Sequence, residues 1–142
     1  MKKGLLLFLG FLLISCSTKL KTSDTKPLYE ILTRQQDGGA SIRFFEILSE
    51  EREIKMLQND PLLRNKISGN DLKGSNFIIL NMGEKNTMGY TIEIENAVET
   101  ADKINIKVRD VDPKTTTIPG HEVYYYPYTI VKVNSKKAIS IQ

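Results

Sequence analysis

The sequence contains only one histidine, and this scarcity excludes most of the chemistry that histidine supports. His121 alone cannot build a multi-histidine metal site, and a Ser-His-acid triad would have to use it without any Gly-x-Ser-x-Gly turn to hold the nucleophile. Asp110, Asp112 and Glu122 carry oxygen ligands suited to Ca²⁺, but the spacing of a calcium-binding loop is absent, so we interpret them as an acidic turn. We therefore expect no enzyme active site, cofactor or metal.

Cysteine is equally scarce, and its single occurrence lies at the end of an export signal. Lys2 and Lys3 precede an apolar run, residues 4–14, that is too short to span a bilayer as a helix. The segment LISC, residues 13–16, resembles the bacterial lipobox, in which the signal is cut before a cysteine that receives acyl chains. Two or more acyl chains give stable anchoring. The pattern predicts removal of residues 1–15 and lipidation of Cys16; the alternative is an ordinary signal peptide with a free thiol.

The mature chain would also lack any large excess of charge. Loss of Lys2 and Lys3 leaves 18 Lys and Arg residues against 17 Asp and Glu residues, so no basic stripe indicates nucleic-acid binding. A lipidated Cys16 leaves no thiol for a disulfide, a nucleophile or a metal. Ser17 follows the cysteine, where aspartate would favour the inner membrane. We expect a periplasmic or cell-surface protein, on the outer membrane where a cell has two.

The sequence predicts three parts: the signal peptide, a lipidated cysteine with a flexible polar tether over residues 16–27, and a single domain over residues 28–142. We expect an α+β or mainly β fold, a compact antiparallel sheet or sandwich of five to seven strands with one helix. β-favouring runs cover residues 28–34, 41–48, 75–82, 90–95, 103–109 and 122–133, with 138–141 as a further short strand. Helical spacing covers residues 50–59 after Ser49, a natural N-cap.

Two strand pairings can be predicted. Asp37-Gly38 lies between the first two strands and is a strong hairpin signal. Residues 90–95 and 103–109 alternate between apolar and polar, and a constant number sum of 198 places Ile94 opposite Ile104 and Glu95 opposite Lys103, around a loop at residues 97–101. This register turns Glu93 and Glu95 to solvent, so we interpret them as a wet sheet face and not as an acid/base pair.

Two further patterns are candidates for binding. The segment GEKNTMG, residues 83–89, lacks the Gly-Lys-Ser/Thr order and the following helix of a phosphate loop. Its two glycines allow backbone conformations closed to other residues. Tyrosines at positions 124, 125, 126 and 128 favour either a protein-binding surface or sheet packing, and Pro127 interrupts their alternation.

Three segments together resemble the PrcB C-terminal domain family: GEKNTMGYTIEI at residues 83–94, an alternating strand ending in Val108-Arg109, and PYTIVKV at residues 127–133. The family has proline in place of Asn86, glycine in place of Met88 and histidine in place of Thr129. It is named after an accessory lipoprotein of a bacterial surface protease complex. The resemblance covers about residues 74–133.

The resemblance implies a non-enzymatic, lipid-anchored domain that binds a protein partner and stabilises or matures a protease. Gly83 and Gly89 would set the shape of the loop. The residues expected to line the contact are Lys85, Thr87, Met88, Gly89 and Tyr90. The alternative is a protease inhibitor that presents this loop to a protease cleft, because residues 86–90 are also similar to the Asn-Pro-Thr-Thr-Gly-Tyr loop of chagasin-type inhibitors, although one residue shorter and without the proline.

Overall fold

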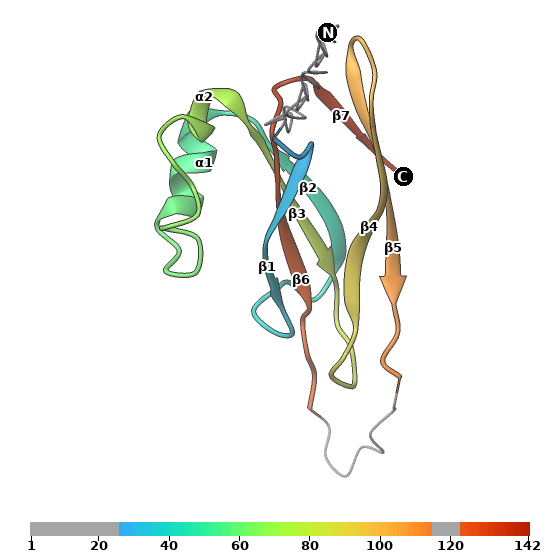
Figure 1. The fold of residues 1–142 in the computed structure, drawn as a ribbon. Helices are drawn as coiled ribbons and strands as arrows, with labels where there is room; N and C mark the ends of the chain where they lie inside the picture. The colour runs from blue at the N-terminus through green and yellow to red at the C-terminus, as the bar shows by residue number, and fades with distance from the viewer. Residues whose placement is uncertain (1–25, 115–122) are drawn as a thin grey trace, which may run out of the picture.

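The computed structural model describes residues 26–114 and 123–142, which form two β-sheets and two helices (Figure 1). The four-stranded sheet has the order β1-β6-β3-β2, with β1 (Tyr29–Gln35), β2 (Arg43–Leu48), β3 (Asn76–Met82) and β6 (Tyr128–Val133). The three-stranded sheet has the order β4-β5-β7, with β4 (Thr91–Glu99), β5 (Lys103–Val111) and β7 (Ala138–Ile141). Only the β5–β7 pair is parallel among these strands. The predicted seven-strand, mainly β fold with few helices is confirmed.

The two sheets pack face to face, and alternation along β3 shows why. Its even-numbered residues, among them Ile78 and Leu80, point into the core between the sheets together with Ile92, Ile104 and Val131. All five are fully buried. β3 is therefore buried on both faces, because its odd-numbered residues are covered from the other side.

The second core lies on the outer face of the four-stranded sheet. Phe77 of β3 is fully buried there beneath Ile54 of α1 (Glu51–Gln58) and Leu63, and the short helix α2 (Asp71–Gly74) leads into β3. The predicted helix is confirmed, but its N-cap is Glu50 and not Ser49. The Glu53 carboxylate accepts the backbone N–H of Glu50 at 3.0 Å and that of Ser49 at 3.1 Å. A capping box formed by Glu50 and Glu53 thus takes the place of the expected hydroxyl cap.

The predicted hairpin between the first two strands is wrong, because β1 and β2 lie at opposite edges of their sheet with β6 and β3 between them. The connecting residues 36–42 are instead fastened to those central strands. Gly39 donates its N–H to the Tyr126 carbonyl at 2.9 Å. The buried Asn81 amide accepts from the Ala40 N–H at 2.9 Å and donates to the Ile42 carbonyl at 2.6 Å. Long-range pairing therefore outweighs the local turn signal.

The predicted hairpin of β4 and β5 is present, but its register is wrong. Ile94 pairs with Val108 and not with Ile104, and a bulge follows in β4. The turn decides the register: it spans only residues 100–102 and is closed by a hydrogen bond from the Thr100 N–H to the Lys103 carbonyl at 2.8 Å. Cross-strand ion pairs form on the wet face as expected, with Lys107 as the partner of Glu95 at 2.7 Å.

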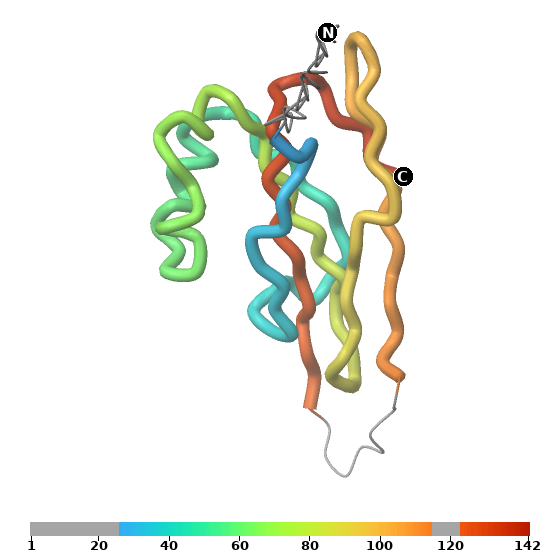
Figure 2. The backbone as a smooth tube through the Cα atoms, in the orientation of Figure 1, coloured from blue at the N-terminus to red at the C-terminus, as the bar shows by residue number. Residues whose placement is uncertain are grey.

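Antiparallel pairing collects the connections at two ends of the sandwich (Figure 2). The entry end comprises residues 26–28, 100–102 and 134–137, and the loop end comprises residues 36–42, 83–90, 112–114 and 123–127. Thr129 joins the sheets between these ends, since its buried hydroxyl donates to the Ile92 carbonyl at 3.0 Å. Within the described residues, no helix has the length and apolar character needed to cross a membrane.

Candidate functional site

The loop over residues 83–90 runs from β3 in one sheet to β4 in the other, and its first residue must be glycine. Gly83 has a φ of +79°, which side chains rarely allow, and a Cβ there would lie 3.0 Å from the Arg43 nitrogen and 3.1 Å from the Ser41 carbonyl oxygen. Glu84 donates its N–H to the same Ser41 carbonyl at 3.0 Å. The loop therefore starts pressed against the backbone of the β1–β2 connection.

The next residues of the loop are paired with the segment that leads into β6. Lys85 and Tyr125 exchange two backbone hydrogen bonds, each of 2.8 Å. The Tyr126 hydroxyl donates to the Glu84 carboxylate at 3.2 Å. Desolvation, together with the Glu84 carboxylate, raises the pKa of Tyr126, so this hydroxyl keeps its donor proton to a higher pH than an ordinary tyrosine does.

The far side of the loop is held by Gln36, a residue that the sequence analysis did not identify. Its side-chain Oε1 accepts the Gly89 N–H at 2.6 Å and its Nε2 donates to the Tyr90 carbonyl at 3.1 Å. The Gln36 amide thus supplies the acceptor and the donor that the backbone of a neighbouring strand would otherwise provide. Gly89 has a φ of +98°, and a Cβ there would lie 2.7 Å from the Pro113 Cβ. The predicted conformational role of both glycines is confirmed.

The predicted contact residues differ in what they offer a partner. Met88 is 56 % exposed and forms the apolar part of the loop surface. Lys85 and Tyr90 are half-buried and stack on each other, with the ammonium group 5.1 Å from the ring centre. Thr87 is only 8 % exposed, and its hydroxyl has no hydrogen-bond partner among the described residues. Thr87 therefore supports the loop from within, and the part of these residues in binding stays a prediction.

The tyrosine-rich segment does not form one continuous stripe. Tyr124 is exposed beside Val123 at the loop end, whereas Tyr126 turns its hydroxyl to Glu84. Tyr128 packs against the outer core beneath the helices. The packing interpretation therefore holds at Tyr128, whereas a part of the exposed Tyr124 in binding stays a prediction. His121 and Glu122 lie outside the described residues.

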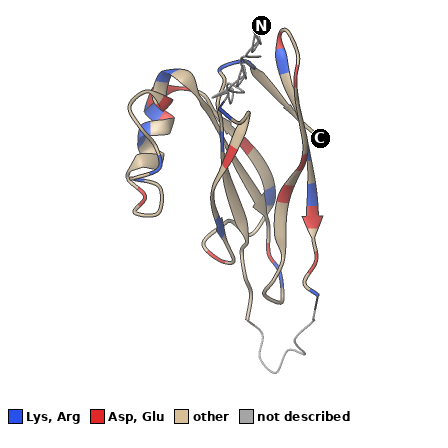
Figure 3. Ribbon diagram, in the orientation of Figure 1, with Lys and Arg blue, Asp and Glu red and all other residues tan. Residues whose placement is uncertain are grey.

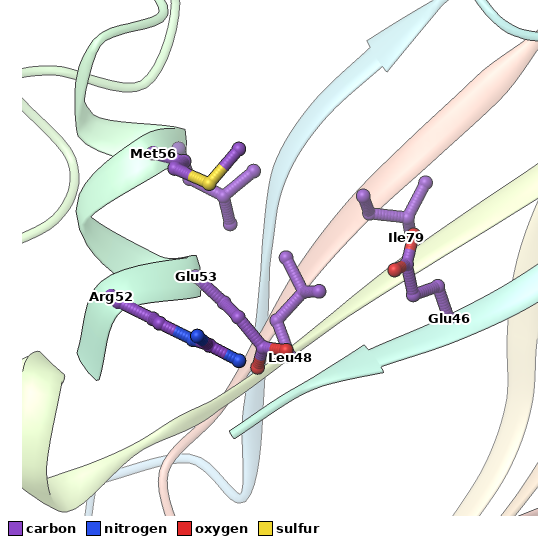
Figure 4. A pocket seen from close by; sticks show the side chains of 7 residues that line it. Glu46, Leu48, Arg52, Glu53, Met56 and Ile79 are labelled. Carbon is purple, nitrogen blue, oxygen red and sulfur yellow. The ribbon is translucent and has the colours of Figure 1, made fainter. Parts of the chain in front are cut away.

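A groove of about 610 Å³ lies away from this loop, between α1 and the outer face of the four-stranded sheet (Figure 4). Met56 on the helix lies above Leu48, and Glu46 and Ile79 lie further along the sheet. The Glu53 carboxylate at its end is occupied with the helix N-terminus. In the part of the chain that the structure describes, no group of three His, Cys, Asp or Glu side chains could hold a metal ion.

A buried charge network joins three elements near the entry end. Lys132 on β6 is 8 % exposed and lies 3.1 Å from a Glu30 oxygen and 3.6 Å from an Asp71 oxygen. Hydrogen bonding from Asn134 lowers the pKa of Glu30, with help from Lys132. Burial raises the pKa of Asp71, but hydrogen bonds from Ser68 and the charge of Lys132 outweigh this and hold it below its ordinary value. The arrangement favours a structural role.

The fold and the site together define a two-sheet β-protein that projects a glycine-bounded, firmly held loop from one end. The family model described as PrcB C-terminal matches residues 76–134. The resemblance predicted from the motifs is therefore confirmed over these residues. No curated protein and no solved structure matches the chain. The matched segment contains the loop and the strands β3, β4, β5 and β6. Gln36 and Ser41, which hold the loop, lie outside this segment.

Proposed function

We propose that this protein is a membrane-anchored bacterial lipoprotein whose domain binds a protein partner without catalysis, as an accessory or stabilising subunit of a protease complex. The family name supports an association with a protease complex. The lipobox-like segment ending in Cys16 supports the anchor. The surface proposed to meet the partner is the loop over residues 83–90, with Met88 at its exposed part and the stacked Lys85 and Tyr90 beside it.

One observation carries this proposal: the loop is held at both sides and still exposes an apolar side chain. Backbone or amide hydrogen bonds fix Glu84, Lys85, Gly89 and Tyr90, while Met88 remains 56 % exposed. Association costs ordering entropy for every mobile segment at an interface, so a loop that is already ordered binds with a smaller penalty. Burial of a methionine side chain contributes about 1.5–3 kcal/mol.

Capture of the partner from intact cells tests the proposal. We expect the Met88→Ala, Tyr90→Ala double variant to lower crosslinking and pull-down of the partner by at least about tenfold, because the loss of about 1.4 kcal/mol or more corresponds to that factor. Met56→Ala is the matched control, since Met56 is 71 % exposed on α1, which lies away from the connection between β3 and β4 (Figure 1). Equal thermal stability of the variants would show that the fold is intact, and an unchanged set of captured proteins would refute the assignment.

The anchor has its own test. Cys16→Ser should abolish incorporation of labelled palmitate and move the protein from the membrane fraction to the soluble fraction. Retention of the label in the variant would contradict lipidation of Cys16, whatever the outcome of the partner capture.

Protease inhibition is the second candidate, because the exposed Met88 lies in a loop bounded by Gly83 and Gly89 with a shape suited to entering a cleft. An inhibitor would lower the activity of papain-like or serine proteases at stoichiometric amounts, whereas an accessory subunit would leave or raise the activity of its own protease. Titration of the purified domain against both protease classes separates the two candidates.

A further inference from the structure

The chain enters the fold at the end opposite to the loop. Pro27 and Leu28 accept hydrogen bonds from Asn134, at 2.7 Å from its side chain and 2.9 Å from its backbone N–H. β1 then starts at Tyr29, which pairs with Val133 at the end of β6. Figure 1 shows this end and the connection between β3 and β4 at opposite ends of the sandwich. Strands of seven to nine residues separate the two ends by about 25 Å.

We propose that the entry end faces an anionic lipid surface and that the loop end points away from it, so that the membrane presents the loop over residues 83–90 to partners. This inference rests on the proposed lipidation of Cys16. Residues 17–25 connect that cysteine to the described fold. A chain of this length cannot exceed about 30 Å even when fully extended. The entry end is therefore held near the headgroups, and the loop end can extend beyond the reach of the tether.

The charges at the two ends favour the same orientation. Four exposed lysines at or beside the entry end form no ion pair within the described residues: Lys26, Lys73, Lys103 and Lys136. Their exposed acidic neighbours are Asp102, Glu50 and Glu51, and of these Glu50 is paired with Arg52 and Glu51 with Lys55. Glu99 is paired with Lys137 at 2.9 Å. Figure 3 shows basic and acidic residues, coloured blue and red on the ribbon, at the turn between β4 and β5.

The loop end has no such excess of cations. Asp37, Glu84 and Asp112 are exposed there and offset Lys114, Arg34 and Lys85, which is held over the Tyr90 ring. An anionic leaflet attracts lysines and repels carboxylates within a Debye length of about 8 Å at physiological salt. A domain that rotates on its tether is therefore biased toward presenting its lysines to the lipid.

Energy transfer from the protein to an acceptor lipid tests this orientation. Lipidated protein has no free thiol at Cys16, so Ala101→Cys at the entry end or Asn86→Cys at the loop end provides the single labelling site. In vesicles containing phosphatidylglycerol, we expect about twofold higher transfer efficiency from Ala101→Cys than from Asn86→Cys, given the separation of the ends. Equal transfer from the two sites, or higher transfer from Asn86→Cys, would overturn the proposal.

Charge reversal separates the contributions of the lysines and the tether. Lys73→Glu with Lys103→Glu should reduce the difference between the two labels, whereas Lys114→Glu at the loop end, the control, should preserve or increase it. A difference that persists unchanged in the double variant would refute the role of the lysines.

The same measurement distinguishes failure of this inference from failure of the anchor. A second set of proteins carries a hexahistidine tag in place of residues 1–16 and is held on vesicles that contain nickel-chelating and phosphatidylglycerol lipids. Mass spectrometry that finds Cys16 unmodified refutes the lipoprotein assignment alone. Equal transfer from both labels on the nickel vesicles refutes the orientation, whether or not Cys16 is lipidated.

Discussion

The two ends of the sandwich are stabilised by different interactions. At the entry end, buried charges join the elements, with Lys132 held between Glu30 and Asp71. At the loop end, backbone pairs and two side-chain amides, those of Gln36 and Asn81, hold the loop, and the charged contacts, Glu84 with Tyr126 and Arg43 with Asp110, are exposed. A buried charge network depends on the protonation of its carboxylates, whereas amide hydrogen bonds do not. The entry end should therefore respond to pH, and the loop should keep its shape over the same range.

The largest effect on the free energy of unfolding is expected from adding a side chain at Gly39, at the loop end. A Cβ at this position would lie 2.2 Å from the Asn81 Oδ1 and 2.6 Å from the Tyr126 carbonyl oxygen. Gly39→Ala must displace both central strands or break the Asn81 hydrogen bonds, so we expect a loss of about 3 kcal/mol in the free energy of unfolding. Gly69→Ala is the control, because nothing lies within 4 Å of its added Cβ. Similar denaturant midpoints for the two variants would contradict the close packing at Gly39.

A smaller effect is expected at the entry end, and it should depend on pH. Asp71→Asn removes one partner of the buried Lys132 and should cost about 2 kcal/mol at pH 7. The folded pKa of Asp71 is lowered, so its contribution is fully present above the unfolded value of about 3.9 and is lost as the pH falls through the folded value. Glu30 has a lowered pKa and acts with the same sign.

Thermal unfolding of wild type and Asp71→Asn at pH 7 and pH 3 measures this dependence. The difference in melting temperature should shrink at pH 3, and Asp102→Asn, an exposed change at the same end, should alter stability by less than about 0.5 kcal/mol. A difference that is equal at both pH values would show that the charge of Asp71 contributes nothing.

The smallest effect on stability, about 1 kcal/mol, is expected for Gln36→Ala. Its main result should be local: faster hydrogen exchange of the Gly89 amide, which loses its acceptor. Gln36→Glu keeps an acceptor for Gly89 but lacks the donor to the Tyr90 carbonyl, so it should protect Gly89 better than alanine does. Gln35→Ala at the adjacent position is the control. Unchanged exchange at Gly89 in Gln36→Ala would show that other contacts hold the loop.

The elements and the loop were predictable from sequence because their signals are local. Apolar runs, alternation and helical spacing indicated the strands and α1, and two glycines indicated the unusual backbone of residues 83–89. The partners of the elements were not predictable in the same way. The Asp37-Gly38 turn signal indicated a hairpin, yet β6 and β3 lie between β1 and β2. The register of β4 and β5 followed the three-residue turn at 100–102 and not the apolar match that we used.

The candidate site was half predictable for the same reason. Met88 and Tyr90 stand out in the sequence as apolar and aromatic residues in a polar loop. Gln36 does not, because a glutamine at the end of a strand is ordinary until the fold brings Gly89 within 2.6 Å of its side chain. Asn81 offered a stronger signal, since a polar residue inside the apolar run of β3 needs partners when it is buried.

The sequence by itself determined the family motifs, the periodicity of the strands and the two positions where only glycine fits the loop, and it predicts an export signal. The tertiary structure alone decided which strands neighbour each other, that Thr87 is buried while Met88 is exposed, and that the chain enters opposite to the loop. The physical reason is the range of the interactions. Backbone preference and alternation act over a few residues, whereas strand order, burial and the relation of the two ends depend on contacts between residues up to 107 positions apart.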